Sequence, residues 1–147
     1  MAQKLTRSIK KAEVKQKWVL VDAADVRIGK LATKVTSLLM GKQNVNNADY
    51  QITGDKVVII NALKIAYHQS KLISKLYPVH SGYPGGFKQL KFKELLVSNP
   101  EYIIRQAVWG MLTKNKKGRK LLTNLYVFNG TDHKFSAQNP VKIDLAK

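Results

Sequence analysis

The chain has 147 residues, of which 26 are Lys or Arg and 9 are Asp or Glu, giving a formal net charge of +17. It contains no Cys, which excludes disulfides, thiolate metal sites and a Cys nucleophile, and no apolar run approaches the roughly 20 residues of a membrane helix. Because hydrophobic residues make up 44% of the chain, enough for a core, we interpret residues 17–147 as one domain behind a basic arm at residues 1–16.

The first part of the chain shows a strand pattern followed by a helix pattern. Trp18–Val21 is a short, continuous apolar run, which is typical of a strand covered on both faces. Apolar residues then recur at helical spacing over residues 28–39, with Lys and Ser on the opposite side. Asp25 is placed to cap the start of this helix, and Gly41 is placed to end it. We therefore predict one strand and one helix here.

The middle of the chain combines one clear strand with segments of weaker pattern. Residues 43–51 are polar and rich in Asn, which indicates a loop, whereas Val57–Ile60 is the clearest strand pattern in the chain. Residues 63–77 show no single periodicity, and we predict short strands and a turn there. A glycine-rich loop follows at residues 80–86, and the apolar residues within 92–96 predict a short helix.

Asn99–Glu101 marks the start of another helix, because Asn is a preferred N-cap and Pro fits the first helical position. The predicted core face of this helix consists of Ile103, Ile104, Ala107, Val108, Met111 and Leu112. Residues 113–120 then form a predicted basic loop, and Leu125–Phe128 is a third apolar strand. Strands that alternate with helices predict an α/β domain with a largely parallel sheet.

The acidic residues are unevenly distributed, and this gives the net charge a more specific meaning. No Asp or Glu occurs between Lys56 and Lys93 or between Tyr102 and Thr131, although basic residues are frequent in both stretches. Such clusters indicate several contact surfaces for a polyanion, which relieves the repulsion among the cations. Nucleic-acid phosphates are the favoured partner, with an anionic membrane surface as the alternative. The excess of Lys over Arg favours phosphate contact over bidentate base reading.

The segment His80–Lys88 is the most distinctive run in the chain. Its glycines allow backbone N–H groups to approach an anion closely, and Tyr83 could stack on a base or a sugar. The spacing of a dinucleotide fingerprint is absent. An ordinary tight loop is an equally good interpretation of these residues.

The predicted basic loop at residues 113–120 follows an apolar helix and carries five positive charges. A solvated run of charge is the usual explanation for such a segment. Because Gly118 and the flanking helices would fix the backbone here, we favour a rigid phosphate clamp. Trp109 stands one position from the apolar face of the preceding helix, and either the edge of the core or a stacking surface would account for it.

Enzymatic alternatives find little support in the sequence. Asp22, Asp25 and Asp55 could converge near strand ends and hold Mg²⁺ as in a nuclease, but turn and capping roles explain Asp22 and Asp55 better. The three His residues show no metal-ligand spacing. Neither a nucleophile elbow nor a phosphate-binding Walker loop is present. A peripheral membrane role is disfavoured because no exposed helix has a strongly amphipathic pattern.

Taken in chain order, these segments resemble the universal large-subunit ribosomal protein family thirteen in its bacterial form. The similarity extends from about Lys17 to Pro140, which is nearly the whole chain. The segments that carry it are Trp18–Ala23 with Gly29–Thr33, Gly54–Ala62, His80–Gly86 with Lys88, Ala107–Leu112 with Asn115, Gly118 and Arg119, Tyr126–Gly130, His133, and Ala137–Pro140. The glycine-rich segment is close to the most recognisable motif of that family.

The resemblance implies a three-layer α/β/α sandwich with a mostly parallel central sheet of about four strands. It also implies a structural constituent of the large ribosomal subunit that binds large-subunit rRNA, mainly through phosphate contacts, supports early subunit assembly and contacts neighbouring ribosomal proteins. No catalytic activity, cofactor, metal, membrane or small-molecule substrate is expected, and the expected location is the ribosome in the cytoplasm, with an organellar ribosome left open. The residues expected to contact RNA are Lys10, Lys11, Lys34, Lys42, Lys64, Lys71, Lys75, His80, Ser81, Gly82, Tyr83, Gly85, Gly86, Lys88, Lys114, Asn115, Lys116, Lys117, Arg119, Lys120, His133 and Lys134.

The chain departs from the family pattern at a few positions. The family usually has a basic residue where Trp109 stands, a Pro where Thr113 stands, and a His where Phe135 stands. It also has Thr-Gly in place of His68–Gln69. These departures imply the loss of local phosphate contacts at two aromatic positions and a different turn near Gln69, without consequences for the fold.

Overall fold

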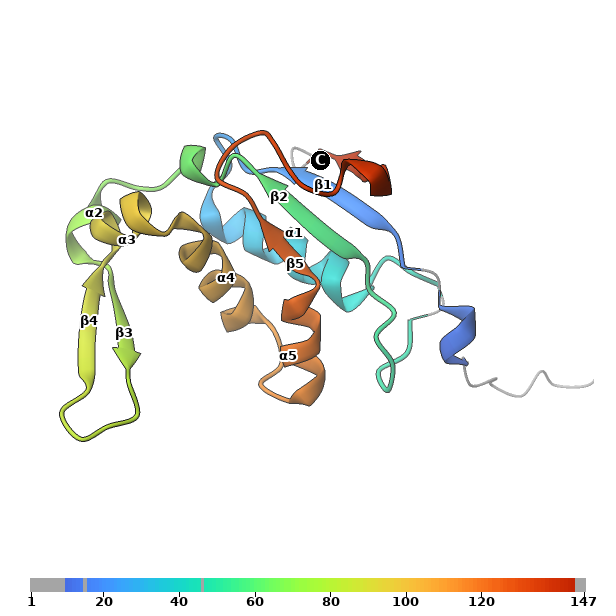
Figure 1. Cartoon of the computed structure of the whole chain (residues 1–147), viewed down its shortest axis with the longest axis horizontal. Helices are drawn as coiled ribbons and strands as arrows, with labels where there is room; N and C mark the ends of the chain where they lie inside the picture. The colour runs from blue at the N-terminus through green and yellow to red at the C-terminus, as the bar shows by residue number, and fades with distance from the viewer. Residues whose placement is uncertain (1–9, 15, 46, 145–147) are drawn as a thin grey trace, which may run out of the picture.

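The computed structural model describes residues 10–14, 16–45 and 47–144 of the chain. Its strands are β1 (Trp18–Asp22), β2 (Lys56–Ile60), β3 (Leu76–His80), β4 (Phe87–Lys91), β5 (Leu125–Val127) and β6 (Val141–Ile143). Its helices are α1 (Ile28–Met40), α2 (Ser70–Ser74), α3 (Phe92–Ser98), α4 (Pro100–Met111) and α5 (Lys116–Thr123), with 3₁₀ helices η1 (Lys11–Glu13), η2 (Ala62–Lys64) and η3 (Ser136–Gln138). Figure 1 shows a body of sheet and helices from which the β3–β4 hairpin extends at one end.

A four-stranded parallel sheet with the strand order β5-β2-β1-β6 forms the centre of the body. Strand β1 runs beside β2 from Trp18 opposite Lys56 to Asp22 opposite Ile60. This sheet confirms the predicted α/β class and the parallel arrangement of about four strands. Strand β6 at the edge was not predicted, because its three residues have no distinctive pattern and their pairing with β1 determines their conformation.

Helices α1, α4 and α5 pack against one face of the sheet. Val19 and Val21 of β1 alternate with less buried neighbours and join Val57 and Ile59 of β2 in the core beneath these helices. The helices contribute large apolar side chains that are fully buried, among them Leu31, Leu39, Ile103, Ile104 and Leu121. The buried face of β1, whose residues alternate, and the apolar faces of α1 and α4 therefore pack together in one continuous core.

An aromatic layer covers the opposite face of the sheet. Phe135 precedes η3, and its ring centroid lies 4.8 Å from that of Trp18 in β1 and 4.5 Å from that of Tyr126 in β5. Trp18 and Tyr126 also stack on each other at 5.6 Å. The connection from β5 to β6, which contains η3, thus forms the third layer of the domain without an α-helix. Phe135 therefore serves the packing of this layer.

The start of α1 differs from the prediction, whereas its end agrees with it. Arg27, in extended conformation, is the N-cap residue of α1 and supplies no side-chain cap. Asp25, the expected cap, lies in a turn with φ of +57°, and its N–H donates to the Lys64 carbonyl at 3.0 Å. The Asp25 prediction was wrong because this turn holds the chain against η2 before the helix begins. Gly41 ends the helix in the left-handed conformation, as predicted.

The second half of the domain confirms one helix start and corrects two predictions. Asn99 caps α4 by accepting a hydrogen bond from the Tyr102 N–H at 3.2 Å. Met111, which was assigned to the core face of α4, is 45% exposed because the last turn of the helix passes the edge of the core. The predicted loop at residues 113–120 is wrong from Lys116 onward, where α5 begins, whereas residues 113–115 do connect the two helices. The sequence pattern did not reveal α5 because its first turn is rich in Lys and only Gly118 and Leu121 are buried.

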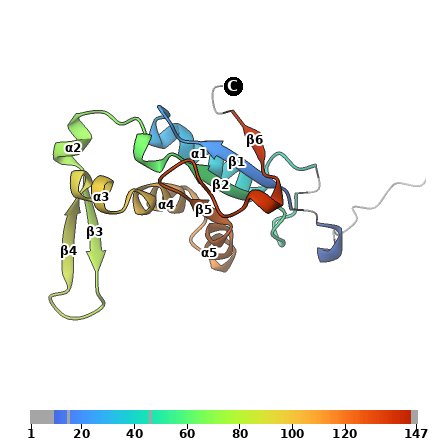
Figure 2. The same ribbon diagram turned by 45° about the horizontal axis from the view of Figure 1, so that its top comes forward.

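The hairpin of β3 and β4 projects from the end of the body that α2 and α3 form (Figures 1 and 2). Tyr77 anchors its base, with ring centroids 6.3 Å from Phe92 and 6.2 Å from Tyr102. Further along the hairpin most side chains are exposed. Residues 63–77 accordingly contain η2, the short helix α2 and the start of β3, instead of short strands and a turn. An isolated two-stranded sheet is marginally stable in water, so this projection suits a surface that a partner covers.

Phe92 should contribute more to stability than any exposed residue of its helix. It is fully buried at the point where the hairpin, α2 and α4 meet, so we expect Phe92→Ala to lower the free energy of unfolding by about 3–5 kcal/mol. Val97 lies on the same helix and is 81% exposed, and Val97→Ala should change stability by less than about 0.5 kcal/mol. Urea denaturation of both variants measures the difference, and equal values would contradict this account of the core.

Candidate nucleic-acid interface

The acidic residues that could have formed a metal site lie far apart on the sheet. Asp22 is the last residue of β1, whereas Asp55 precedes the first residue of β2. Because β1 and β2 are parallel and in register, these two carboxylates lie at opposite ends of the sheet. Within the described parts of the chain, no group of three or more His, Asp or Glu residues could hold a metal ion. The convergence of Asp22, Asp25 and Asp55 that a nuclease would need is therefore absent.

Asp22 instead holds two chain segments together. Its Oδ1 accepts hydrogen bonds from Asn61 Nδ2 at 2.9 Å and from the Ala24 N–H at 3.0 Å. The bond from Asn61, followed by that from Ala24, lowers the pKa of the Asp22 carboxyl below its ordinary value. Asn61 itself has a φ of +58°, a conformation that Asn tolerates better than most residues. The turn role assigned to Asp22 is confirmed.

The histidines act within their own loops in this structure. His80 Nδ1 accepts a hydrogen bond from the Gly82 N–H at 2.9 Å, and His133 Nδ1 accepts one from the Phe135 N–H at 3.3 Å. His68 Nδ1 lies 2.7 Å from Ser70 Oγ at the start of α2. Each ring therefore stabilises a local turn through one nitrogen, which leaves Nε2 as the atom that could face a partner.

Helix α5 carries the densest group of predicted site residues, and its start is held by an Asn cap and by a close backbone contact. Asn115 caps the helix by accepting hydrogen bonds from the Gly118 N–H at 2.8 Å and from Thr113 Oγ1 at 3.1 Å. A Cβ atom at Gly118 would lie 1.8 Å from the Thr113 carbonyl oxygen, so only Gly fits at this position. This close approach places the basic first turn of α5 rigidly on the body, as a clamp requires.

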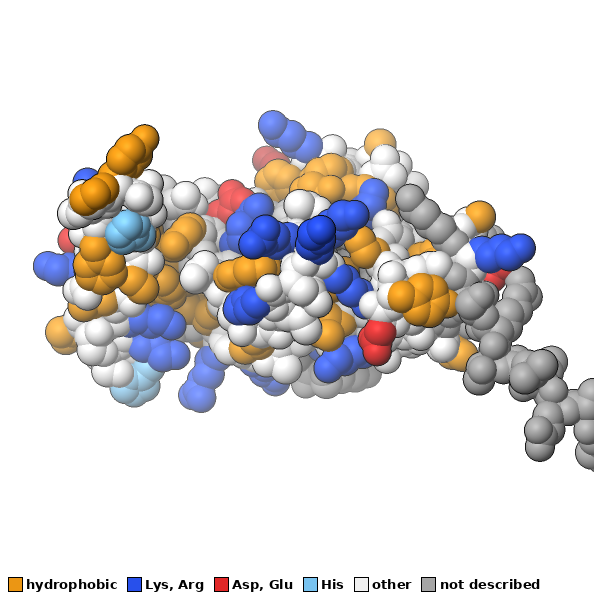
Figure 3. All heavy atoms as spheres, turned by 90° about the horizontal axis from the view of Figure 1, so that it is seen from below, with side chains coloured by type: hydrophobic (Ala, Val, Ile, Leu, Met, Phe, Trp, Pro, Cys, Tyr) orange, Lys and Arg blue, Asp and Glu red, His pale blue; other side chains and the backbone are white. Residues whose placement is uncertain are grey.

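A basic groove, here called the lysine groove, lies between α5 and the segment that leads into β2. It has a volume of about 860 Å³, and none of the described residues that line it is acidic. Its cations are Lys56, Lys116, Lys117 and Lys120. Figure 3 shows Lys and Arg side chains gathered over the middle of the molecule, where α5 lies. Lys56 was not predicted as a site residue, because only the tertiary contact of α5 with this segment brings it to the groove.

Some of these lysines already have partners within the protein. Lys117 Nζ donates to the Asp49 carbonyl at 2.9 Å and lies 3.4 Å from the Ala48 carbonyl oxygen, which ties α5 to the loop between α1 and β2. Lys56 Nζ lies 4.7 Å from the centre of the Trp18 ring. Lys116 and Lys120 are exposed and form no ion pair with a described residue. The groove thus combines lysines that shape it with lysines that are open to an anion.

The tip of the hairpin forms a second cluster of predicted site residues. The amides of Ser81, Gly82 and Gly86 already donate hydrogen bonds within the tip, to acceptors on Gly86, His80 and Tyr83. Backbone capture of an anion therefore has fewer free donors here than the glycines suggested. The side chains are better placed, since Tyr83 is 76% exposed and Lys88 is exposed beside it on β4.

The remaining predicted residues are dispersed over other parts of the surface. Lys71 and Lys75 lie at the base of the hairpin, Lys34 and Lys42 lie on and after α1, and Lys64 lies in η2. On the opposite face of the sheet, His133 and Lys134 belong to the segment before η3, and at the other end of the chain Lys10 and Lys11 lie at η1. Residues 1–9 and 15 of the predicted basic arm lie outside the described residues. The structure thus gathers the site residues into two clusters, at α5 and at the hairpin, and leaves the others apart.

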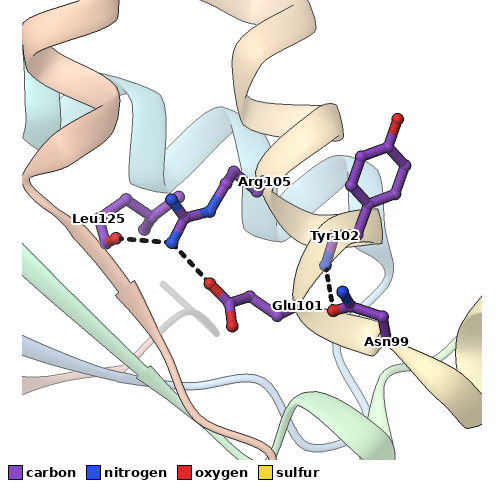
Figure 4. A network of polar contacts seen from close by, with 5 residues as sticks. All are labelled: Asn99, Glu101, Tyr102, Arg105 and Leu125. Carbon is purple, nitrogen blue, oxygen red and sulfur yellow. Dashed lines mark hydrogen bonds and ion pairs between the residues drawn. The ribbon is translucent and has the colours of Figure 1, made fainter. Parts of the chain in front are cut away.

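One ion pair joins two described residues, and it lies on α4. Arg105 Nη2 donates to Glu101 Oε1 at 2.6 Å and lies 3.5 Å from the Leu125 carbonyl oxygen (Figure 4). Both side chains are about 40% exposed, so the pair contributes little to stability. Its main electrostatic effect is to neutralise a carboxylate near α5.

Comparisons with known proteins identify relatives along most of the chain. A family model described as "Ribosomal protein L13" matches residues 16–134. A protein of Thermoanaerobacter sp. (strain X514) named "Large ribosomal subunit protein uL13" is 42% identical over 136 residues, covering 92% of this chain and 95% of the relative. Proteins of the same name from Salinispora arenicola and Thermotoga maritima are 46% and 44% identical over 140 residues, covering 95% of this chain and 95% and 94% of the relatives.

A methyl group should be tolerated at one helical glycine and rejected at another. Gly118→Ala places a Cβ against the Thr113 carbonyl, and we expect the free energy of unfolding to fall by about 1–3 kcal/mol. Gly110 in α4 has open space around its Cβ position, so Gly110→Ala should raise stability by about 0.5–1 kcal/mol. Thermal and urea unfolding of the two variants test this, and a neutral Gly118→Ala would show that α5 is loosely attached.

The contribution of Asp22 to stability should depend on pH in the acid range. Because the folded-state pKa of Asp22 lies below its ordinary value of 3.8, the ionised form stabilises the fold above that value, and this stabilisation is lost as the pH falls through the folded-state pKa. We expect Asp22→Asn to be less stable than the wild type at pH 7, with the difference shrinking below about pH 3.8. Urea denaturation across this range measures it, and a difference independent of pH would contradict the assignment.

Proposed function

The chain belongs to the ribosomal protein L13 family, and from this premise we propose that it is a structural constituent of the large ribosomal subunit that binds large-subunit rRNA mainly through phosphate contacts. The observation that carries the RNA-binding mode is the lysine groove, in which Lys116 and Lys120 of α5 are exposed and none of the described lining residues is acidic. The family is one of non-enzymatic ribosomal proteins, and this chain is not an enzyme.

Electrostatics at the start of α5 support binding to phosphate. The N-terminal end of a helix carries partial positive charge, which acidic residues in the first turn usually offset. Here the first turn contains Lys116, Lys117 and Arg119 and no acidic residue. A phosphate beside this turn would be stabilised by the side-chain charges and by the helix end together. The arrangement is unfavourable for an unbound helix and favourable for one that contacts RNA.

The hairpin supplies a second contact surface at the end of the body. Tyr83 and Lys88 near its tip offer an aromatic face and a cation, and Lys71 and Lys75 add charge at its base. A protein that contacts RNA at two separated surfaces can hold two RNA segments in a fixed relation. We therefore infer a role in early assembly of the subunit, with rRNA and neighbouring ribosomal proteins as partners and the ribosome in the cytoplasm as the location.

The two competing hypotheses have less support in the structure. The carboxylates needed for metal-dependent cleavage lie at opposite ends of the sheet. Among the described residues, no helix combines the length and apolar character needed to cross a membrane. The test that bears most directly on the proposal is sedimentation of tagged protein with large subunits, together with binding to large-subunit rRNA at increasing salt.

Removing the open lysines of α5 should weaken RNA binding without unfolding the protein. We expect Lys116→Gln with Lys120→Gln to lower affinity for a large-subunit rRNA fragment and to reduce the log–log salt slope by about 0.9 for each lost phosphate contact on a duplex. The unfolding midpoint should stay unchanged, because neither side chain bonds to any described residue. Filter binding between low and moderate salt measures both the affinity and the slope.

A matched pair controls for the loss of two charges. Lys30 in α1 and Lys93 in α3 are exposed and stand outside the two clusters, so Lys30→Gln with Lys93→Gln should leave most of the salt slope intact. If both double variants lose the same affinity, the binding is non-specific and the lysine groove is not its centre. Binding that is independent of salt would refute the phosphate mode altogether.

A further inference from the structure

A second, smaller groove lies between α4 and α5, apart from the lysine groove. It has a volume of about 210 Å³ and is lined by Tyr102, Arg105, Gln106, Trp109, Arg119 and Leu122. The α4 residues among these lie three, four and seven positions after Tyr102 and therefore share one face of the helix. Arg119 and Leu122 share a face of α5 for the same reason. The groove is thus a direct product of how these two helices pack.

Its lining joins aromatic surface to cationic groups. Trp109 is half-buried, and the Lys114 ammonium lies 4.3 Å from the centre of its indole ring while also donating to the Trp109 carbonyl. Arg119 is exposed, and its side chain forms no ion pair with a described residue. The acidic residue nearest in sequence, Glu101, is neutralised by Arg105. The surroundings of the indole therefore carry net positive charge.

This combination fits an unpaired nucleotide better than an apolar peptide. A base has flat faces that pack against an aromatic side chain, and stacking of this kind tolerates any base. The phosphate of the same nucleotide requires a cation close by, which Arg119 supplies. An apolar peptide would leave this cation without a partner, and an RNA helix would keep its bases inside the stack.

We propose that the groove between α4 and α5 receives one unpaired nucleotide of rRNA, with its base against Trp109 and its phosphate at Arg119. The proposal rests on the proposed function, since it names the part of the RNA that this surface contacts. It adds a mode of recognition to the phosphate contacts of the lysine groove.

Affinity measurements separate stacking from charge. For the large-subunit rRNA fragment that the wild type binds, we expect Trp109→Ala to weaken binding at least roughly fivefold, with the salt slope unchanged because no cation is lost. Trp109→Phe should retain most of the affinity, and Arg119→Gln should lower the slope. Val97→Ala, which removes an exposed apolar side chain on α3, is the matched control and should bind as the wild type does.

Fluorescence reports on the groove directly and does not depend on a destabilising change at Trp109. In Trp18→Phe the indole of Trp109 is the one remaining tryptophan, since the chain has 2 Trp residues. Its emission should fall when the rRNA fragment binds and should not change when a fully paired RNA duplex of equal length binds. Unfolding midpoints of all variants establish that binding losses are not folding losses.

The outcomes distinguish this inference from the proposed function. If the fragment binds with a normal salt slope but Trp109→Ala binds like Val97→Ala and the emission is unchanged, the groove holds no nucleotide and the proposed function stands. If Trp109→Ala loses only incorporation into large subunits, a protein neighbour occupies the groove and the inference is wrong. If no large-subunit RNA binds to the wild type, the proposed function itself fails.

Discussion

Strand β2 imposes the central constraint on this structure, because its apolar residues must be covered on both faces. Val57 and Ile59 lie under the helices, whereas Val58 and Ile60 belong to the opposite face and are also buried. The chain therefore has to place helices on one side and other apolar material on the second side. The aromatic layer around Phe135 fulfils the second requirement. With both faces of the sheet covered, α5 has a fixed position beside the segment that leads into β2, and the lysine groove lies between the two.

The basic residues are subject to the opposite constraint, because an apolar core of this kind cannot hold unpaired cations and they must lie at the surface. The excess of basic residues is thus displaced to the ends of helices and to the hairpin, where internal carboxylates are scarce. Between described residues one ion pair forms, on α4, and it leaves the cations of α5 uncompensated. A free chain of this composition bears the cost of self-repulsion, and a polyanion removes it. The same feature therefore limits the stability of the isolated protein and favours its association with RNA.

How much of the structure the sequence could predict depends on where each element obtains its stability. Strands β1 and β2 are continuous apolar runs, and α4 begins with an Asn-Pro cap, so local patterns were sufficient for them. Helix α5 was missed because its first turn is basic and its anchor is the contact of Gly118 with a carbonyl outside the helix. Strands β4 and β6 depend on their partner strands. Both grooves require contacts between distant segments, which neither periodicity nor composition reveals.

The structure also divides the lysines into groups that a count of charge cannot separate. Lys117 bonds to the backbone of the loop between α1 and β2, and Lys56 and Lys114 each lie over a tryptophan ring. Such residues shape the surface, and an RNA phosphate would have to compete with contacts they already make. Lys116 and Lys120 have no such contact with the part of the chain that the structure describes. If the lysine groove binds RNA as proposed, we therefore expect the protein to neutralise fewer phosphates than the number of lysines around the groove, and stacking on Trp109 would add to the affinity that these charges provide.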